Sequence, residues 1–232
     1  MQLDNLIAQR LREEEARDKA LHTPSGKLSA SQLSKPLLEQ VLKLIGVPQA
    51  PFSDYSLRLF KRGKQVEEWI CSMLDGEEQI ETEYRNTIGY IDKMINGTPV
   101  EIKSVKSSQW KWLEKQGPNP GYCMQAALYA LGTNSDESVI IMVSADDFRT
   151  QEHTIRTIDW KDRIDSIIDE VDDALKSRTL PAFTPREDWQ GKPEYADKYS
   201  SYPDWVSLPP ELAMQKLRND YPDSYKKLTG EK

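Results

Sequence analysis

The 232-residue sequence has few cysteines, few histidines and no long apolar run. Its two cysteines, Cys71 and Cys123, exclude a disulfide framework, a four-cysteine zinc site and a cysteine-ligated iron–sulfur cluster. His22 and His153 stand alone, without the spacing of a metal site. No apolar stretch approaches the ~18 residues needed to span a membrane, and the start lacks the basic and apolar regions of a signal peptide. We therefore expect a soluble intracellular protein without an iron–sulfur cluster.

Acidic side chains outnumber basic ones by 38 to 31, which gives a formal net charge of −7. Proteins that coat nucleic acid without sequence preference are usually basic overall. The net charge therefore argues against that class. Most of the acidic residues lie near the N-terminus and after residue 158. Basic stretches elsewhere in the chain stay available for a more specific contact with an anionic partner.

Apolar periodicity and turn signals predict an α/β fold. Helices are expected over five segments: 2–20, 29–46 (or 31–46), 53–74, 119–131 and 159–178. Strands are expected over five more: 78–84, 87–95, 98–104, 139–143 and 152–157. Strands joined by tight turns, followed by a helix and a fully buried strand, imply a mixed central sheet with helical flanks.

The chain is expected to have three parts. Residues 1–52 form N-terminal helices, and residues 53–180 form the α/β core. Residues 181–232 are an irregular C-terminal extension with a short helix near 211–219. The aromatic side chains of this extension are expected to pack onto the core: Trp189, Tyr195, Tyr199, Tyr202 and Trp205.

The turn between the second and third expected strands fixes their pairing. Asn96-Gly97 favours a two-residue type I′ turn, which pairs Ile95 with Thr98. In this register Asp92 faces Glu101 across the hairpin as a close pair without hydrogen bonds. Two carboxylates in that position destabilise a hairpin unless a cation or a proton compensates for their charge.

Lys103, two residues beyond Glu101, lies on the same face of the hairpin. The opposite face carries apolar side chains that can enter a core: Ile91, Ile95, Val100 and Ile102. Carboxylate oxygens suit Mg²⁺ or Mn²⁺, and a lysine beside such an ion can stabilise developing negative charge. This combination fits phosphodiester hydrolysis better than glycoside hydrolysis, which would not need the lysine. An acid-x-lysine pattern recurs at Asp159-Trp160-Lys161, where it marks only the start of a helix.

Four ordered motifs resemble those of the PD-(D/E)XK nuclease superfamily: Gly63-x-x-x-Glu67, Gly89-x-Ile-Asp92, Val100-Glu101-Ile-Lys103 and Gln125-x-x-x-Tyr129. They are most similar to the RecB-type and phage lambda-type (YqaJ-like) exonuclease branch, over about residues 55–145. The resemblance implies a restriction-endonuclease-like αβββαβ core, so residues 53–180 would be a nuclease core. Many RecB-type relatives have a histidine in the first motif, where this sequence has Glu67.

The resemblance also implies roles for the motif residues. Asp92, Glu101 and the main-chain carbonyl of Ile102 would ligate Mg²⁺ or Mn²⁺, and Glu67 would complete the acidic site directly or through water. Lys103 would be the catalytic lysine.

Gln125 and Tyr129 lie four residues apart and therefore on one face of a helix. The resemblance implies that they organise the site or the DNA strand. A plain core position is the alternative for Tyr129.

Basic side chains flank the motifs, and such clusters can follow a phosphate backbone even in an acidic protein. Trp110 and Trp112 are expected in a polar loop over residues 107–119, where exposed aromatic rings would stack on unpaired bases. An equal alternative is that both rings seal the core beneath this loop. The residues expected to contact DNA are Arg58, Arg62, Lys64, Lys106, Trp110, Lys111 and Trp112.

The sequence therefore predicts a metal-dependent DNA exonuclease in the cytoplasm of a bacterial or phage-infected cell. Its expected partners are DNA ends or single strands, together with a recombination or single-strand-binding protein. The preference for exonuclease rests on the Gln125/Tyr129 motif alone. A structure-specific or restriction-like endonuclease of the same fold is one alternative. A non-catalytic DNA-binding recombination partner is another, although the full set of motif residues disfavours it.

Overall fold

The computed structural model describes residues 3–21, 25–185 and 200–231. Its helices are α1 (Leu3–Leu21), α2 (Leu37–Ile45), α3 (Asp54–Met73), α4 (Ser107–Gln116), α5 (Pro120–Thr133), α6 (Lys161–Ser177), α8 (Pro210–Asp220) and α9 (Pro222–Thr229). Its strands are β1 (Leu28–Ser29), β2 (Glu77–Tyr84), β3 (Thr87–Ile95), β4 (Thr98–Val105), β5 (Glu137–Ser144) and β6 (Thr150–Arg156). His22, Trp189, Tyr195 and Tyr199 lie outside the described residues. No helix in the described ranges has the length and apolar character required to cross a bilayer.

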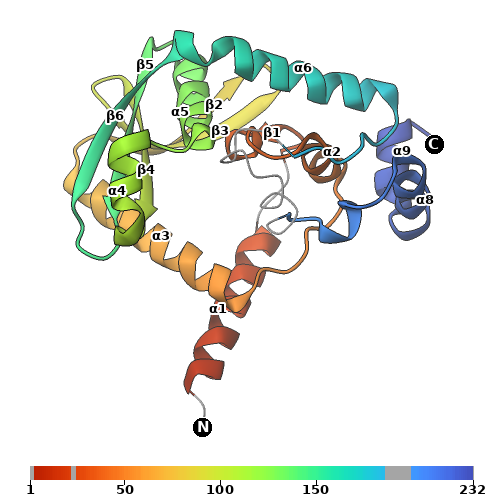
Figure 1. The fold of residues 1–232 in the computed structure, drawn as a ribbon, viewed down its shortest axis with the longest axis horizontal. Helices are drawn as coiled ribbons and strands as arrows, with labels where there is room; N and C mark the ends of the chain where they lie inside the picture. Colours follow the sequence, from red (N-terminus) through yellow and green to blue (C-terminus); the bar gives the residue numbers. More distant parts are fainter. Residues whose placement is uncertain (1–2, 22–24, 186–199, 232) are drawn as a thin grey trace.

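The strands form one mixed sheet of six strands, with α3 on one face and α5 on the other. The strand order is β1-β3-β4-β5-β6, and β2 pairs with the free side of β3. β3 and β4 are antiparallel, whereas β4 and β5 are parallel. The order α3-β2-β3-β4-α5-β5 confirms the predicted αβββαβ core and the mixed α/β fold class (Figure 1).

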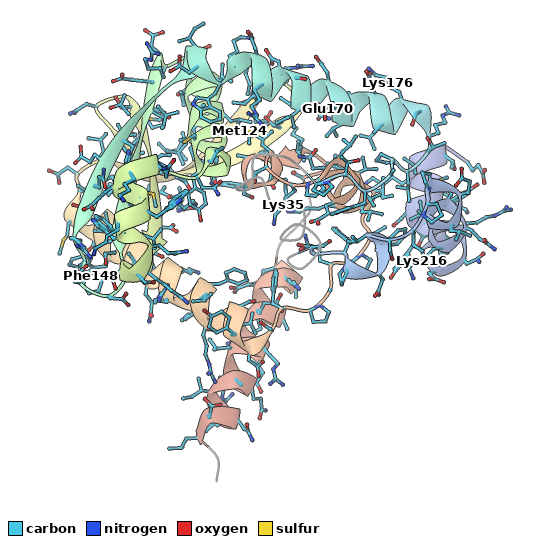
Figure 2. All side chains as sticks on the ribbon, in the orientation of Figure 1. Lys35, Met124, Phe148, Glu170, Lys176 and Lys216 are labelled. Carbon is cyan, nitrogen blue, oxygen red and sulfur yellow. The ribbon has the colours of Figure 1, made fainter. Side chains whose placement is uncertain are left out.

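Strand β5 shows why both faces of the sheet are covered. Ile140 and Met142 are buried among residues of α5, including Met124, which is labelled in Figure 2. Ile141 and Val143 are buried on the other face, against α3. Side chains alternate between faces along a strand, so a strand that is apolar at consecutive positions needs a helix on each side.

Local signals in the sequence set the ends of α3 and the β3–β4 hairpin. The Ser53 side chain caps α3 by accepting a hydrogen bond from the Ser56 N–H at 3.1 Å. Asn96 and Gly97 have φ angles of 49° and 83°, as a type I′ turn requires. The predicted helix over 53–74 and the predicted turn are therefore confirmed.

Two predicted segments are wrong. Residues 28–32 form β1 and a 3₁₀ turn, and α2 begins only after Pro36. A proline disfavours helical geometry in the residue before it, so a helix beginning at 29 or 31 could not continue through Pro36. Residues 107–116 form α4 where a loop was predicted. Trp110 and Leu113 are both buried on one side of this helix, and their packing outweighs the polar composition of the segment.

Helices from opposite ends of the chain share a second apolar core, which we call the terminal cluster. It consists of Leu38, Val41, Leu42, Ile45, Val47, Leu180, Tyr202, Trp205, Ala213, Leu217 and Leu228. α8 lies where a short helix was predicted, but α9 was not predicted. Figure 1 shows α2, α8 and α9 together, with α6 extending from the sheet towards them. The two terminal parts of the chain therefore pack against each other.

Candidate active site

The candidate site forms where β3 and β4 separate. The pairing predicted from the turn is confirmed as far as Lys93 and Val100, where the ladder ends. Asp92 and Glu101, predicted as the next pair, are not paired in the ladder. Instead, Asp92 Oδ2 accepts a hydrogen bond from the Ile102 N–H at 2.7 Å. The Asp92 side chain thus takes the place of a main-chain partner for β4, and this hydrogen bond fixes the position of the Asp92 carboxylate.

The apolar side chains of β3 before and after Asp92 lie on opposite faces of the sheet. Ile91 is buried on the α5 side of the sheet, whereas Ile95 and Val100 pack on the α3 side. The prediction that Ile91 shares a face with Ile95 is therefore wrong. Pairing between β2 and β3 is interrupted at this point, where Gln79 and Asp92 face each other without a ladder contact. Gln79 has a φ of 52°, so the regular alternation of the strands does not continue through it.

Glu101 is fully buried and forms an ion pair with Lys103. Burial raises the pKa of Glu101 to about 7, and the charge of Lys103 offsets only part of that rise. The Tyr129 hydroxyl also interacts with the Glu101 carboxylate, and this contact lowers the pKa of Glu101 slightly. Burial also raises the pKa of Asp92. Burial lowers the pKa of Lys103, but Glu101 and Asp92 outweigh that effect and raise it overall.

Glu67 lies on α3 beside these residues. Burial and the negative charge of Asp92 raise the pKa of Glu67 to about 7. The Gln79 side-chain amide donates a hydrogen bond to Glu67 Oε1 at 3.3 Å. Asp92 therefore interacts with both Glu67 and Glu101, and all three acids have raised pKa values.

Gln125 and Tyr129 are joined by a hydrogen bond, with Gln125 Nε2 lying 2.7 Å from the Tyr129 hydroxyl. The ring of Tyr129 is buried and would contact any side chain at Gly89, because a Cβ there would lie 2.4 Å from Tyr129 Cε1. Burial and the charge of Glu101 raise the pKa of Tyr129 well above its usual value. Tyr129 therefore packs in the core and also borders the acidic site.

The oxygen atoms of this site fit a hard divalent cation. Within the described ranges, no three His, Cys, Asp or Glu side chains come close enough together to hold a metal ion. Glu67 therefore does not form a three-acid cluster with Asp92 and Glu101. Two buried carboxylates with raised pKa values beside one lysine leave negative charge to be neutralised. Carboxylate oxygens are ligands that suit Mg²⁺ or Mn²⁺, and Ile102, whose carbonyl is the third predicted ligand, lines the cleft above them.

A cleft of about 900 Å³ lies over the site between α3, β2 and β4. Its charged lining residues are Arg62, Lys64, Glu67, Glu68, Glu78 and Lys103. The sequence did not reveal two other lining residues, Gln79 and Tyr122. Lys103 Nζ lies 5.5 Å from the Tyr122 ring centroid. Tyr122 precedes Gln125 by three residues on the same helix, and this spacing could have indicated a shared face. No sequence signal marks Gln79, whose conformation depends on strand pairing.

Three basic residues expected to contact DNA do not line the cleft, and they differ in whether a neighbouring side chain holds them. Arg58 is held by an ion pair with Asp4 of α1 at 2.6 Å. Lys106 donates a hydrogen bond to the Tyr55 hydroxyl at 2.6 Å. Lys111 is exposed on α4. An anionic ligand would have to replace the partner of Arg58 but would meet Lys111 directly.

The two tryptophans of α4 have different environments. Trp110 is only 5% exposed, packs in the core and has the Arg149 guanidinium 4.8 Å from its ring centroid. It therefore cannot stack on a base in this conformation. Trp112 is 43% exposed. The alternative that the ring seals the core is therefore correct for Trp110. The contact of Trp112 with DNA stays a prediction.

No protein-family model matches this sequence, and no curated protein matches it. Among solved structures, SSO0001 superposes with a TM-score of 0.56 and 15% identity, covering 90% of this chain and 98% of that chain. The chain has the fold of SSO0001. The alkaline exonuclease LHK-Exo from Laribacter hongkongensis gives a TM-score of 0.49 at 15% identity, covering 66% of this chain and 91% of that one. A phage-related exonuclease from Haemophilus somnus 129PT gives 0.45 at 15% identity, with coverages of 65% and 96%. The likeness to SSO0001 extends over most of both chains and concerns the fold alone.

Proposed function

We propose that this protein is a metal-dependent deoxyribonuclease that degrades DNA from its ends. The observation that carries the proposal is the burial of Asp92 and Glu101 beside the partly exposed Lys103, at the point where β3 and β4 separate. Buried acids with raised pKa values, placed beside a lysine in a cleft, are typical of catalytic sites. The same residues match the motifs that resemble PD-(D/E)XK nucleases.

Each group has a role in phosphodiester hydrolysis, in which water adds across one P–O ester bond. Asp92, Glu101 and the Ile102 carbonyl would hold Mg²⁺ or Mn²⁺, which would lower the pKa of the attacking water and neutralise phosphate charge. Lys103 stays protonated because its pKa is raised. Its ammonium group donates hydrogen bonds to the phosphate oxygen on which negative charge develops. The ion pair with Glu101 keeps that ammonium group directed into the site.

Degradation from ends is supported by the Gln125/Tyr129 motif, whose two side chains are hydrogen-bonded beside Glu101. Arg62 and Lys64 line the cleft and supply positive charge for a phosphate backbone. We further propose that the enzyme acts in the cytoplasm in recombination, repair or phage DNA processing, with a recombination or single-strand-binding protein as partner. An endonuclease of the same fold is the second candidate, because the cleft is open to solvent.

The test compares end-labelled linear DNA with circular DNA of the same sequence, in Mg²⁺, in Mn²⁺ and in EDTA. The proposal predicts metal-dependent loss of the linear DNA while the circle stays intact. Cleavage of the circle at a comparable rate would identify an endonuclease. Retention of both DNAs in every metal, with a shift in gel mobility, would instead identify a DNA-binding protein without nuclease activity.

A further inference from the structure

Gln79 occupies an irregular position in β2, directly opposite Asp92. The residues on either side keep their partners in β3, since Glu78 pairs with Lys93 and Ile80 pairs with Ile91. Gln79 itself has a φ of 52°, in the left-handed region. A residue with a side chain adopts this conformation only at a cost in free energy. The surrounding strand pairs hold Gln79 in this state, and a glycine at this position would relieve the strain.

The distortion has a consequence for Glu67. The Gln79 amide lines the cleft, and its Nε2 lies 3.3 Å from Glu67 Oε1. Among the described residues, no other side chain donates a hydrogen bond to the Glu67 carboxylate. An amide is a neutral donor, so it can hold this carboxylate without adding charge to a site that already contains Asp92 and Glu101.

We propose that Gln79 is a positioning residue for the acidic site: the distorted strand directs its amide at Glu67 and fixes the orientation of that carboxylate in the cleft. This inference rests on the proposed function and adds to it that Glu67, beside the Asp92–Glu101 pair, completes the acidic site through water rather than as a direct ligand. Partners that orient the groups around a metal typically change metal affinity or activity by ~10–100-fold when they are removed. A side chain that only filled space in β2 would not have this effect.

The test uses two substitutions that separate positioning from folding. Gln79→Ala removes the amide and keeps the backbone strain, whereas Gln79→Gly removes both. Each should lower kcat for DNA cleavage by roughly tenfold with little change in KM, and each should weaken Mn²⁺ binding in the absence of DNA, measured by electron paramagnetic resonance. Gln79→Gly should also raise the melting temperature above that of Gln79→Ala, since glycine adopts positive φ freely.

Asn134 provides the matched control. It has a φ of 55° at the C-terminal end of α5, away from the cleft. Asn134→Gly should leave kcat and Mn²⁺ affinity unchanged. The proposal is overturned if Gln79→Ala keeps both values within about twofold of the wild type, well short of the range for such partners. It is also overturned if kcat and Mn²⁺ affinity fall only by the fraction of molecules that have unfolded.

The Mn²⁺ measurement separates this inference from the proposed function. A wild-type protein that binds Mn²⁺ but cleaves no DNA would contradict the nuclease function, while weaker Mn²⁺ binding by Gln79→Ala would still support the positioning role. Normal DNA cleavage by both proteins would contradict the positioning role alone.

Discussion

The terminal cluster and the floor of the cleft bury polar groups in opposite ways. In the terminal cluster, the buried Tyr202 hydroxyl donates a hydrogen bond to the Val47 carbonyl at 3.2 Å, so burial leaves that donor paired. Beneath the cleft, Asp92 and Glu101 are buried with raised pKa values, and the strand at Gln79 is distorted. Natural proteins keep such unfavourable features mainly where function requires them. The contrast therefore locates the function in the cleft and assigns the terminal cluster to stability.

The sharpest test of this contrast removes the lysine at the cleft. Lys103→Ala should lower the rate of DNA cleavage by ~10²–10³-fold, the usual effect of losing a donor to developing negative charge. DNA binding should be largely retained, because many phosphate contacts share the affinity. Single-turnover cleavage and gel-shift assays measure the two quantities. Lys176→Ala, on the exposed side of α6 (Figure 2), is the control and should behave as wild type. Normal cleavage by Lys103→Ala would show that the site is wrongly assigned.

A substitution in the terminal cluster should have the opposite outcome. Leu217 is fully buried there, and Leu217→Ala should lower the free energy of unfolding by ~2–5 kcal/mol. The rate of cleavage per folded molecule should not change at temperatures where the variant is folded. Denaturant unfolding monitored by circular dichroism, combined with the cleavage assay, checks both parts. A large loss of kcat in a fully folded variant would contradict the division of roles.

The pH dependence of stability should reveal the raised pKa of Glu101, the fully buried acid beneath the cleft. The pKa of Glu101 is about 7 in the folded protein, against an ordinary value of 4.5. Between these values the folded state holds a proton that the unfolded state has released, so stability falls as the pH rises and then levels off. Glu101→Gln cannot lose this proton. In EDTA, it should therefore gain stability relative to wild type from pH 5 to pH 8, on the order of 1–3 kcal/mol.

Thermal unfolding of both proteins at the two pH values measures this difference. Parallel changes in wild type and Glu101→Gln would show that the Glu101 carboxylate is not held at a raised pKa.

The smallest expected effect concerns the exposed ring on α4. Trp112→Ala should weaken binding of single-stranded DNA by about 1 kcal/mol, at the low end for stacking of one base. Trp112→Phe keeps an aromatic ring and should retain the affinity. Fluorescence anisotropy of labelled oligonucleotides in EDTA measures both. Equal affinities of Trp112→Ala and wild type would remove Trp112 from the DNA-binding surface.

Elements determined by neighbouring residues could be predicted from the sequence. Ser53 caps α3, and Asn96-Gly97 sets the hairpin register through positive φ angles. The register held only as far as Lys93 and Val100, so it placed Asp92 near Glu101 and Lys103 but not in the directly facing pair that the sequence predicts. Each of these signals lies within a few residues of the feature that it specifies.

Features that depend on distant contacts could not be predicted. Beyond Val100, β4 leaves β3 but stays paired with β5, which follows it by more than 30 residues in the chain. The helical state of residues 107–116 depends on burial of Trp110 against the core. The terminal cluster joins α2 to helices more than 150 residues later in the chain. The conformation of Gln79 belongs to the same class, because it arises from an interrupted strand pair.

The most direct test of the account measures the melting temperature of metal-free protein as Mn²⁺ is added. A cation that neutralises the buried acids should stabilise the folded state, by several degrees when Mn²⁺ is about a hundredfold above its Kd. The doubly substituted Asp92→Asn, Glu101→Gln protein should melt higher than wild type without metal and should not respond to Mn²⁺. Equal responses of the two proteins, or no response in wild type, would contradict the claim that the cleft is a metal-dependent catalytic site.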